Sequence, residues 1–219
     1  MPKNDYWKLS AFEGARLIRD GSISAEDLVA SCIERTKETN NKINAIVDDL
    51  SVPALERARE LDKHAKKGAF KGPLHGVPIT VKENIDQKGY ATPNGLEGLK
   101  DLIAPGNAPV VDNLERDGAI VIGRTNTPEF SMRGTTDNVI HGRTFNPWND
   151  WASPGGSSGG ASAAVMSGMG SLAHGNDIAG SLRIPSTATG ACTVKPGLGR
   201  VPAYNPSQTQ ERGLVAQLM

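Results

Sequence analysis

Apolar positions in the first third of the chain recur with the spacing of amphipathic helices. Ser10 and Glu13 form a capping-box pattern, and the apolar positions of the stretch include Phe12 and Ile18. A helix is therefore predicted from Ser10 to about Gly21, with its apolar side packed against the protein.

Two further helices and a short strand are predicted before residue 70. Ser24 begins a second helix with an apolar stripe over 28–33, which makes Cys32 a core residue. A short strand is predicted over 43–47, and a charged surface helix over 51–67.

The pattern changes from helical to strand-like at residue 76. Residues 76–81 are apolar and β-branched, and Lys82 follows directly at their end. Residues 108–117 predict a helix, and 119–123 predict a buried strand of the kind found in parallel sheets. Strand, helix and strand in this order indicate a βαβ unit.

The alternation of helices and strands continues toward the end of the chain. A helix of small residues is predicted over 161–168, a short strand over 172–174, and a further helix start at 181. The predicted fold class is α/β, a mixed, largely parallel β-sheet flanked by helices, in one domain.

Composition and charge disfavour several classes of function. The 24 basic and 24 acidic side chains balance, so neither nucleic acid nor a membrane surface is expected as a partner. No apolar run reaches the roughly 18 residues of a membrane span, and the N-terminus lacks a signal-peptide core. Cys32 and Cys192 lack CxxC spacing and are expected to be two buried thiols, which favours a reducing, cytoplasmic location.

Two clusters of small residues carry the candidate chemistry. Residues 155–160 read GGSSGG and contain Ser157 and Ser158, and residues 176–185 contain Ser181. Glycine lets the backbone approach a ligand closely. Because the stretch between the clusters has room for one helix and one strand, Ser157 and Ser181 are expected at the same edge of the sheet.

Several known chemistries fit these clusters poorly. Residues 155–159 match the G-x-S-x-G nucleophile elbow on Ser157, but His174 comes before Asp177, so the required acid-then-histidine order is missing. Phosphate-loop motifs are absent, and His and Cys never lie at metal-ligand spacing, so no cofactor and no metal is predicted. Serine chemistry without histidine needs another base, and an uncharged lysine can serve.

Three motifs, in order and spacing, resemble those of the amidase signature family: VKEN at 81–84, GGSSGG at 155–160 and DIAGSLRIP at 177–185. The resemblance runs from about 73 to about 200. It implies the amidase signature fold, with N-terminal helices in 1–70 followed by the catalytic core.

The resemblance also implies a role for each reactive side chain. Ser181 is the acyl-accepting nucleophile, Ser157 is a bridging serine on a cis peptide bond, and Lys82 is the terminal base. Because an ammonium cannot accept a proton, Lys82 is expected to be buried and neutral. An oxyanion hole is expected from the backbone N–H groups of Ile178, Ala179, Gly180 and Ser181.

Supporting roles are implied for three neighbours of these residues. Ser158 fixes its loop through hydrogen bonds, and Asp177 and Arg183 brace the turn that carries Ser181. None of the three is expected to react.

Two stretches depart from the family pattern. Ala179 stands where relatives often have glycine, which leaves its backbone N–H in place. Arg133 and Gly134 replace a small Gly-Ser pair, next to Met132 in a segment that lines the substrate pocket of relatives. The resemblance therefore leaves the substrate open.

The predicted activity is hydrolysis of a carboxylic amide to an acid plus ammonia or an amine, through an acyl-enzyme on Ser181. The alternatives are a catalytically silent member that binds an amide or acyl ligand, and a glycine-loop nucleotide-binding module. An amidotransferase-type subunit is disfavoured, because residues 183–185 lack the glutamine typical of that branch.

The expected partners are a small-molecule amide and a C-terminal remainder of the same enzyme, and a homo-oligomer is also considered. Family members are longer, and the apolar end at 214–219 has no helix stop signal. A sheet cut midway would expose apolar surface and a strand edge. Residues 1–219 are therefore expected to be the N-terminal part of one domain, completed by a second chain or a continuation.

Overall fold

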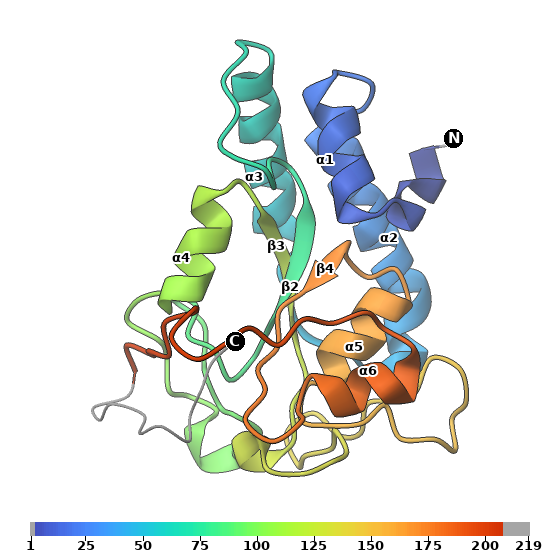
Figure 1. Ribbon diagram of the computed structural model, residues 1–219, viewed down its shortest axis with the longest axis vertical. Helices are drawn as coiled ribbons and strands as arrows, with labels where there is room; N and C mark the ends of the chain where they lie inside the picture. Colours follow the sequence, from blue (N-terminus) through green and yellow to red (C-terminus); the bar gives the residue numbers. More distant parts are fainter. Residues whose placement is uncertain (1–2, 208–219) are drawn as a thin grey trace.

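The central feature of the fold is a short sheet with helices on both faces (Figure 1), seen in a computed structural model that describes residues 3–207. Its regular elements, in chain order, are the 3-10 helix η1 (Lys3–Lys8), α1 (Ala11–Arg19), α2 (Ala25–Ile43), β1 (Ile46–Asp49), α3 (Ser51–Ala65), β2 (Pro78–Lys82), η2 (Glu97–Leu99), α4 (Pro109–Arg116), β3 (Ile120–Thr125), η3 (Glu129–Ser131), α5 (Gly159–Met166), β4 (Leu172–Ala173) and α6 (Arg183–Thr189).

The strands lie in the order β1-β3-β2-β4, with β2 parallel to both of its neighbours and β1 antiparallel to β3. The sheet is thus mixed and largely parallel, which confirms the predicted class. The predicted βαβ unit is also present, as β2, α4 and β3. A crossover helix is the usual way to join two parallel strands.

The register of the parallel strands brings their carboxyl ends to one edge of the sheet. Lys82, the last residue of β2, pairs with Thr125, the last residue of β3, and Thr80 pairs with Ala173, the last residue of β4. Side chains in the segments that follow these strands therefore meet at the same edge.

Each face of the sheet packs on its own set of helices. One face is covered by α1, α2 and α3, which close over Ile120 and Ile122 of β3. On the other face, Ile79, Val81 and Val121 pack with α4 and with residues near 201–203. Figure 1 shows this last segment crossing back from α6 toward α4. Because β2 is covered on both faces, all of its residues are buried, including the terminal lysine.

The predicted elements are present with shifted ends. Helix α2 continues to Ile43 and ends at Asn44, which is left-handed (φ 52°), so the strand predicted over 43–47 begins only at Ile46. Both capping serines are confirmed, because Ser10 accepts the N–H of Glu13 and Ser24 accepts that of Asp27.

Two burial predictions were wrong. Phe12 is exposed, because α1 turns Gly14 and Ile18 toward the protein instead. Cys192 is also exposed, in the irregular segment after α6, whereas Cys32, a residue of α2, is buried as predicted. Neither forms a disulfide. The apolar end at 214–219 lies outside the described residues.

Burial makes Cys32 a poor nucleophile. Desolvation raises the pKa of its thiol to about 12, so almost no thiolate exists at neutral pH. We expect native protein treated with iodoacetamide at pH 8 to remain unlabelled at Cys32, as read by peptide mass spectrometry. The same treatment in guanidinium should label it fully, and rapid labelling of the native protein would contradict the packing of α2.

Candidate active site

Lys82 lies at the centre of a buried polar cluster at the carboxyl edge of the sheet. Its side chain is 0% exposed, which confirms the predicted burial. The amine Nζ lies 2.7 Å from Ser157 Oγ, 2.7 Å from Asn176 Oδ1 and 3.1 Å from Ser158 Oγ. The end of β2, the segment after β4 and the turn before α5 thus meet at one amine.

Ser157 and Ser158 occupy the turn that leads directly into α5. The peptide bond between Gly156 and Ser157 is cis, as the family resemblance implies. Thr127 Oγ1 donates to the carbonyl of Ser157 at 3.1 Å, which ties this turn to the segment after β3.

Gly160 lets the first turn of α5 lie directly on the sheet edge. A Cβ at this position would lie 2.6 Å from both the amide nitrogen and the carbonyl oxygen of Asn126. Neither backbone atom could move without disturbing the end of β3, so a glycine is required here.

The turn that carries Ser181 is organised by Asp177. Its carboxylate accepts from the backbone N–H of Gly180 at 2.7 Å, of Leu182 at 3.1 Å and of Arg183 at 3.3 Å. The Arg183 guanidinium adds two contacts, both 2.9 Å long. Burial alone would raise the pKa of Asp177, but the hydrogen bonds from Arg183 and from the three backbone groups outweigh it and lower this pKa well below its usual value.

The structure brings Ser181 beside the serine pair through its backbone. Ser158 N–H donates to the carbonyl of Ser181 at 3.1 Å. Among the described residues, no hydrogen bond joins the Ser181 hydroxyl to the Ser157 hydroxyl.

The four N–H groups of the expected oxyanion hole are not equivalent. That of Gly180 is occupied by Asp177, whereas those of Ile178, Ala179 and Ser181 donate to no acceptor in the described part of the chain. Ile178 and Ala179 are also exposed. Two of these three donors therefore belong to exposed residues of the turn.

The expected pocket segment lies against the serine turn. A Cβ on Gly156 would collide with the carbonyl oxygen of Arg133 and approach Gly134, so the two stretches are in backbone contact. The Arg133 guanidinium pairs with Glu129, and Met132 is 84% exposed.

Comparison with known proteins agrees with this arrangement. The family model described as Amidase matches residues 27–215. The chain belongs to the amidase family. The resemblance drawn from the three sequence motifs is thus confirmed.

Three relatives illustrate the range of proteins that this amidase-family chain is similar to. An indoleacetamide hydrolase of Bradyrhizobium diazoefficiens is 53% identical over 218 residues, covering 100% of this chain and 42% of that protein. A glutamyl-tRNA(Gln) amidotransferase subunit of Natranaerobius thermophilus is 39% identical, over 90% of this chain and 40% of that protein. The solved structure of a bacterial aryl acylamidase of the amidase signature enzymes superposes with a TM-score of 0.79 at 34% identity, over 83% of this chain and 38% of that one. The chain spans about two fifths of the length of these curated relatives.

Sequence reasoning missed a buried arginine that supports the amidase-family site. Arg124, on β3, has no exposed side-chain surface, and its guanidinium donates to the carbonyls of Glu83 at 2.7 Å, Ile85 at 3.0 Å and Ala91. It also pairs with Asp48 at 2.9 Å. It thereby fixes the chain where it leaves β2, directly after Lys82. A charged residue in an otherwise apolar strand was the sequence signal that could have indicated this role.

Glu83, the residue that follows Lys82, is also fully buried. Glu83 lies just beyond β2, and its carboxylate accepts from the N–H of Gly95 at 3.0 Å and contacts His141 Nε2 at 2.9 Å. Its charge is therefore directed to these two partners.

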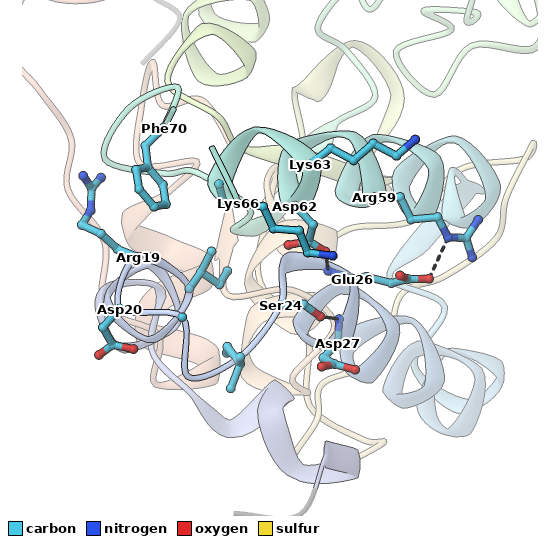
Figure 2. A pocket seen from close by; sticks show the side chains of 14 residues that line it. Arg19, Asp20, Ser24, Glu26, Asp27, Arg59, Asp62, Lys63, Lys66 and Phe70 are labelled. Carbon is cyan, nitrogen blue, oxygen red and sulfur yellow. Dashed lines mark hydrogen bonds and ion pairs between the residues drawn. The ribbon is translucent and has the colours of Figure 1, made fainter. Parts of the chain in front are cut away.

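A surface pocket of about 770 Å³ lies away from this site. Figure 2 shows it between the α1–α2 turn and α3, lined by several charged side chains, of which Glu26 pairs with Arg59 at 2.7 Å. Within residues 3–207, no group of three or more His, Cys, Asp or Glu is placed to hold a metal ion. No helix in the same range has the length and apolar composition needed to cross a membrane.

The contacts of Asp177 predict a pH-dependent contribution to stability. Because its pKa is lower in the folded state, the contribution is present above the unfolded value of about 4 and is lost as pH falls below it. Asp177→Asn should therefore lower the free energy of unfolding by about 2 kcal/mol at pH 7, with a smaller difference at pH 3. Urea unfolding of the whole protein measures both.

The matched control is Asp150→Asn, at an exposed carboxylate. It should leave the free energy of unfolding unchanged at both pH values. A variant at Asp177 that is as stable as the parent at pH 7 would contradict the role of this carboxylate in shaping the turn.

Proposed function

We propose that the protein carrying this chain hydrolyses a carboxylic amide through an acyl-enzyme on Ser181, with Ser157 and Lys82 as its proton relay. The observation that carries the proposal is the 2.7 Å contact between Lys82 Nζ and Ser157 Oγ in a fully buried cluster. The backbone of Ser181 is held against this cluster by Ser158. Membership of the amidase family supports the same reaction class.

In the first half of the reaction, Ser181 Oγ attacks the amide carbonyl carbon while its proton passes to Ser157, whose own proton passes to neutral Lys82. A hydroxyl can serve as a relay because it both donates and accepts. The carbonyl π electrons move onto oxygen, and unoccupied backbone N–H groups of the 178–181 turn hold that anion. When the C–N bond breaks, the proton returns along the relay to the leaving nitrogen.

In the second half, water attacks the acyl-enzyme by the same route. The relay takes a proton from water, the tetrahedral intermediate forms again, and the C–O bond to Ser181 breaks as its oxygen regains a proton. The products are the free acid and a regenerated serine. Ammonia or an amine has left in the first half, so atoms and protons balance without a metal or cofactor.

For the substrate we propose a primary amide with an apolar, aromatic acyl group, of which indoleacetamide is the first candidate. The relative with 53% identity is named for that substrate. Apolar side chains stand exposed on both segments beside the serines: Ile178 is 53% exposed, and Phe130 and Met132 are 59% and 84% exposed. Such side chains fit an apolar acyl group better than a charged one.

A role within an amidotransferase is the second candidate, because the chain is 39% identical to a protein of that kind. Such a protein would release ammonia to a partner, whereas a stand-alone hydrolase needs none. Ammonia release from indoleacetamide by the isolated whole protein would favour the hydrolase, and release only with an added partner would favour the amidotransferase.

Substitution of the three reactive residues tests the proposed roles. Ser181→Ala removes the nucleophile and should lower kcat by at least about 10⁴-fold. Ser157→Ala and Lys82→Arg should each lower it by about 10²- to 10⁴-fold, since the serine still attacks but loses its proton acceptor. The measurement is ammonia release by the whole protein, with circular dichroism to show that each variant is folded.

Near-normal turnover by Lys82→Arg would overturn the assignment of the base, because an arginine side chain stays protonated and cannot accept a proton. Near-normal turnover by Ser181→Ala would overturn the proposed function itself.

Covalent labelling orders the two serines. A fluorophosphonate probe forms a stable bond with an activated serine, so we expect it on the peptide that contains Ser181. Peptide mass spectrometry reads the position, and Ser181→Ala should prevent labelling. Label on Ser157 in the parent protein would instead support the nucleophile-elbow mechanism.

A further inference from the structure

Asn176 contacts the lysine amine directly, although sequence reasoning gave it no role. It lies just after β4 and is 7% exposed, and its Oδ1 lies 2.7 Å from Lys82 Nζ. Its backbone N–H donates to Ser158 Oγ at 3.3 Å, and its carbonyl accepts from the same hydroxyl at 3.2 Å. Side chain and backbone of this residue thus bind two members of the same cluster.

The neighbours of the amine differ in whether they can donate or accept a hydrogen bond. A side-chain amide oxygen only accepts, so Asn176 Oδ1 takes one N–H of Lys82. The Ser158 hydroxyl gives its hydrogen to the carbonyl of Asn176, so its oxygen is available for a second N–H. A neutral amine also has one lone pair, and the hydroxyl of Ser157, 2.7 Å away, can donate its hydrogen to that lone pair.

We propose that Asn176 is a positioning residue for the proposed base: its uncharged oxygen orients the Lys82 amine so that the lone pair faces Ser157, without a negative charge that would keep the amine protonated. This inference rests on the proposed function, because it assigns a partner to the base of that reaction. The uncharged character of the amide is the essential point, since a carboxylate of the same size would also accept the N–H.

The charged groups of the neighbouring elements are engaged with partners of their own. Asp177, the next residue, binds the 180–183 backbone and Arg183, and Glu83 binds Gly95 and His141. Arg124 on β3 binds Asp48 and main-chain carbonyls. Asn176 is therefore the place where a new charge would act on the amine most directly.

Two substitutions separate positioning from a merely structural role. Asn176→Asp keeps the shape but places a carboxylate beside the amine, which favours the ammonium. The acidic limb of the profile of kcat/KM against pH should then move up by at least about one pH unit, with activity regained at high pH. Asn176→Ala removes the acceptor without adding charge, so the limb should move down or stay, while kcat falls about 10-fold and KM changes little.

The measurement is indoleacetamide hydrolysis by the whole protein from pH 5 to 10, with thermal unfolding to show that each variant is folded. Asn149→Asp, an exposed substitution of the same kind, is the matched control and should keep the parent profile. If Asn176→Asp does not fold, the test rests on Asn176→Ala. A lower kcat at unchanged KM supports the positioning role, and an unchanged kcat contradicts it.

A folded Asn176→Asp protein with the parent pH profile would overturn this inference. It would leave the proposed function intact as long as Ser181→Ala and Lys82→Arg remain inactive, so the two failures are distinguishable.

Discussion

The enclosure of one lysine side chain is the constraint on which the candidate site depends. Removing an amine or ammonium from water is unfavourable unless its polar atoms find partners inside the protein. Lys82 has no exposed surface, and the neighbours described above, Ser157, Ser158 and Asn176, come from two segments far from it in sequence. Those segments meet because β2 pairs in parallel with β3 and β4. The hydrogen bonds of this amine therefore depend on the topology of the sheet.

The backbone around the lysine has little regular structure, and buried side chains fix it instead. Arg124 holds the chain that leaves β2 through three carbonyl groups. Asn126 and Asn138 do the same for the chain that leaves β3, with contacts of 2.7 Å between their amides and from Asn138 to the carbonyl of Thr127. Buried irregular backbone needs such partners, because it has no ladder to satisfy its polar groups. The backbone around the site therefore depends on a few buried polar side chains that tolerate little substitution.

Much of this arrangement could be predicted from sequence because its signals are local. The apolar run before Lys82 is buried on both faces, and the capping serines at 10 and 24 are set by residues three positions away. The partners of Arg124 and Asn176 could not be predicted, since they depend on which strands become neighbours. Periodicity also failed to place Phe12, because its spacing from Ile18 does not show which side of α1 faces the protein.

The turn that carries Ser181 is shaped by a negative charge, although the proposed reaction needs a positive potential there. Asp177 occupies the N–H of Gly180 and so removes one donor from the proposed oxyanion hole, while the N–H groups of Ile178, Ala179 and Ser181 have no acceptor within residues 3–207. A carboxylate this close would oppose a developing oxyanion, but Arg183 binds both of its oxygens and balances the charge. What remains is the field of the unoccupied backbone dipoles, which are fixed before the substrate arrives and need no reorganisation as the anion forms. The ion pair between Asp177 and Arg183 therefore shapes the turn, whereas the backbone N–H groups make the electrostatic potential there positive.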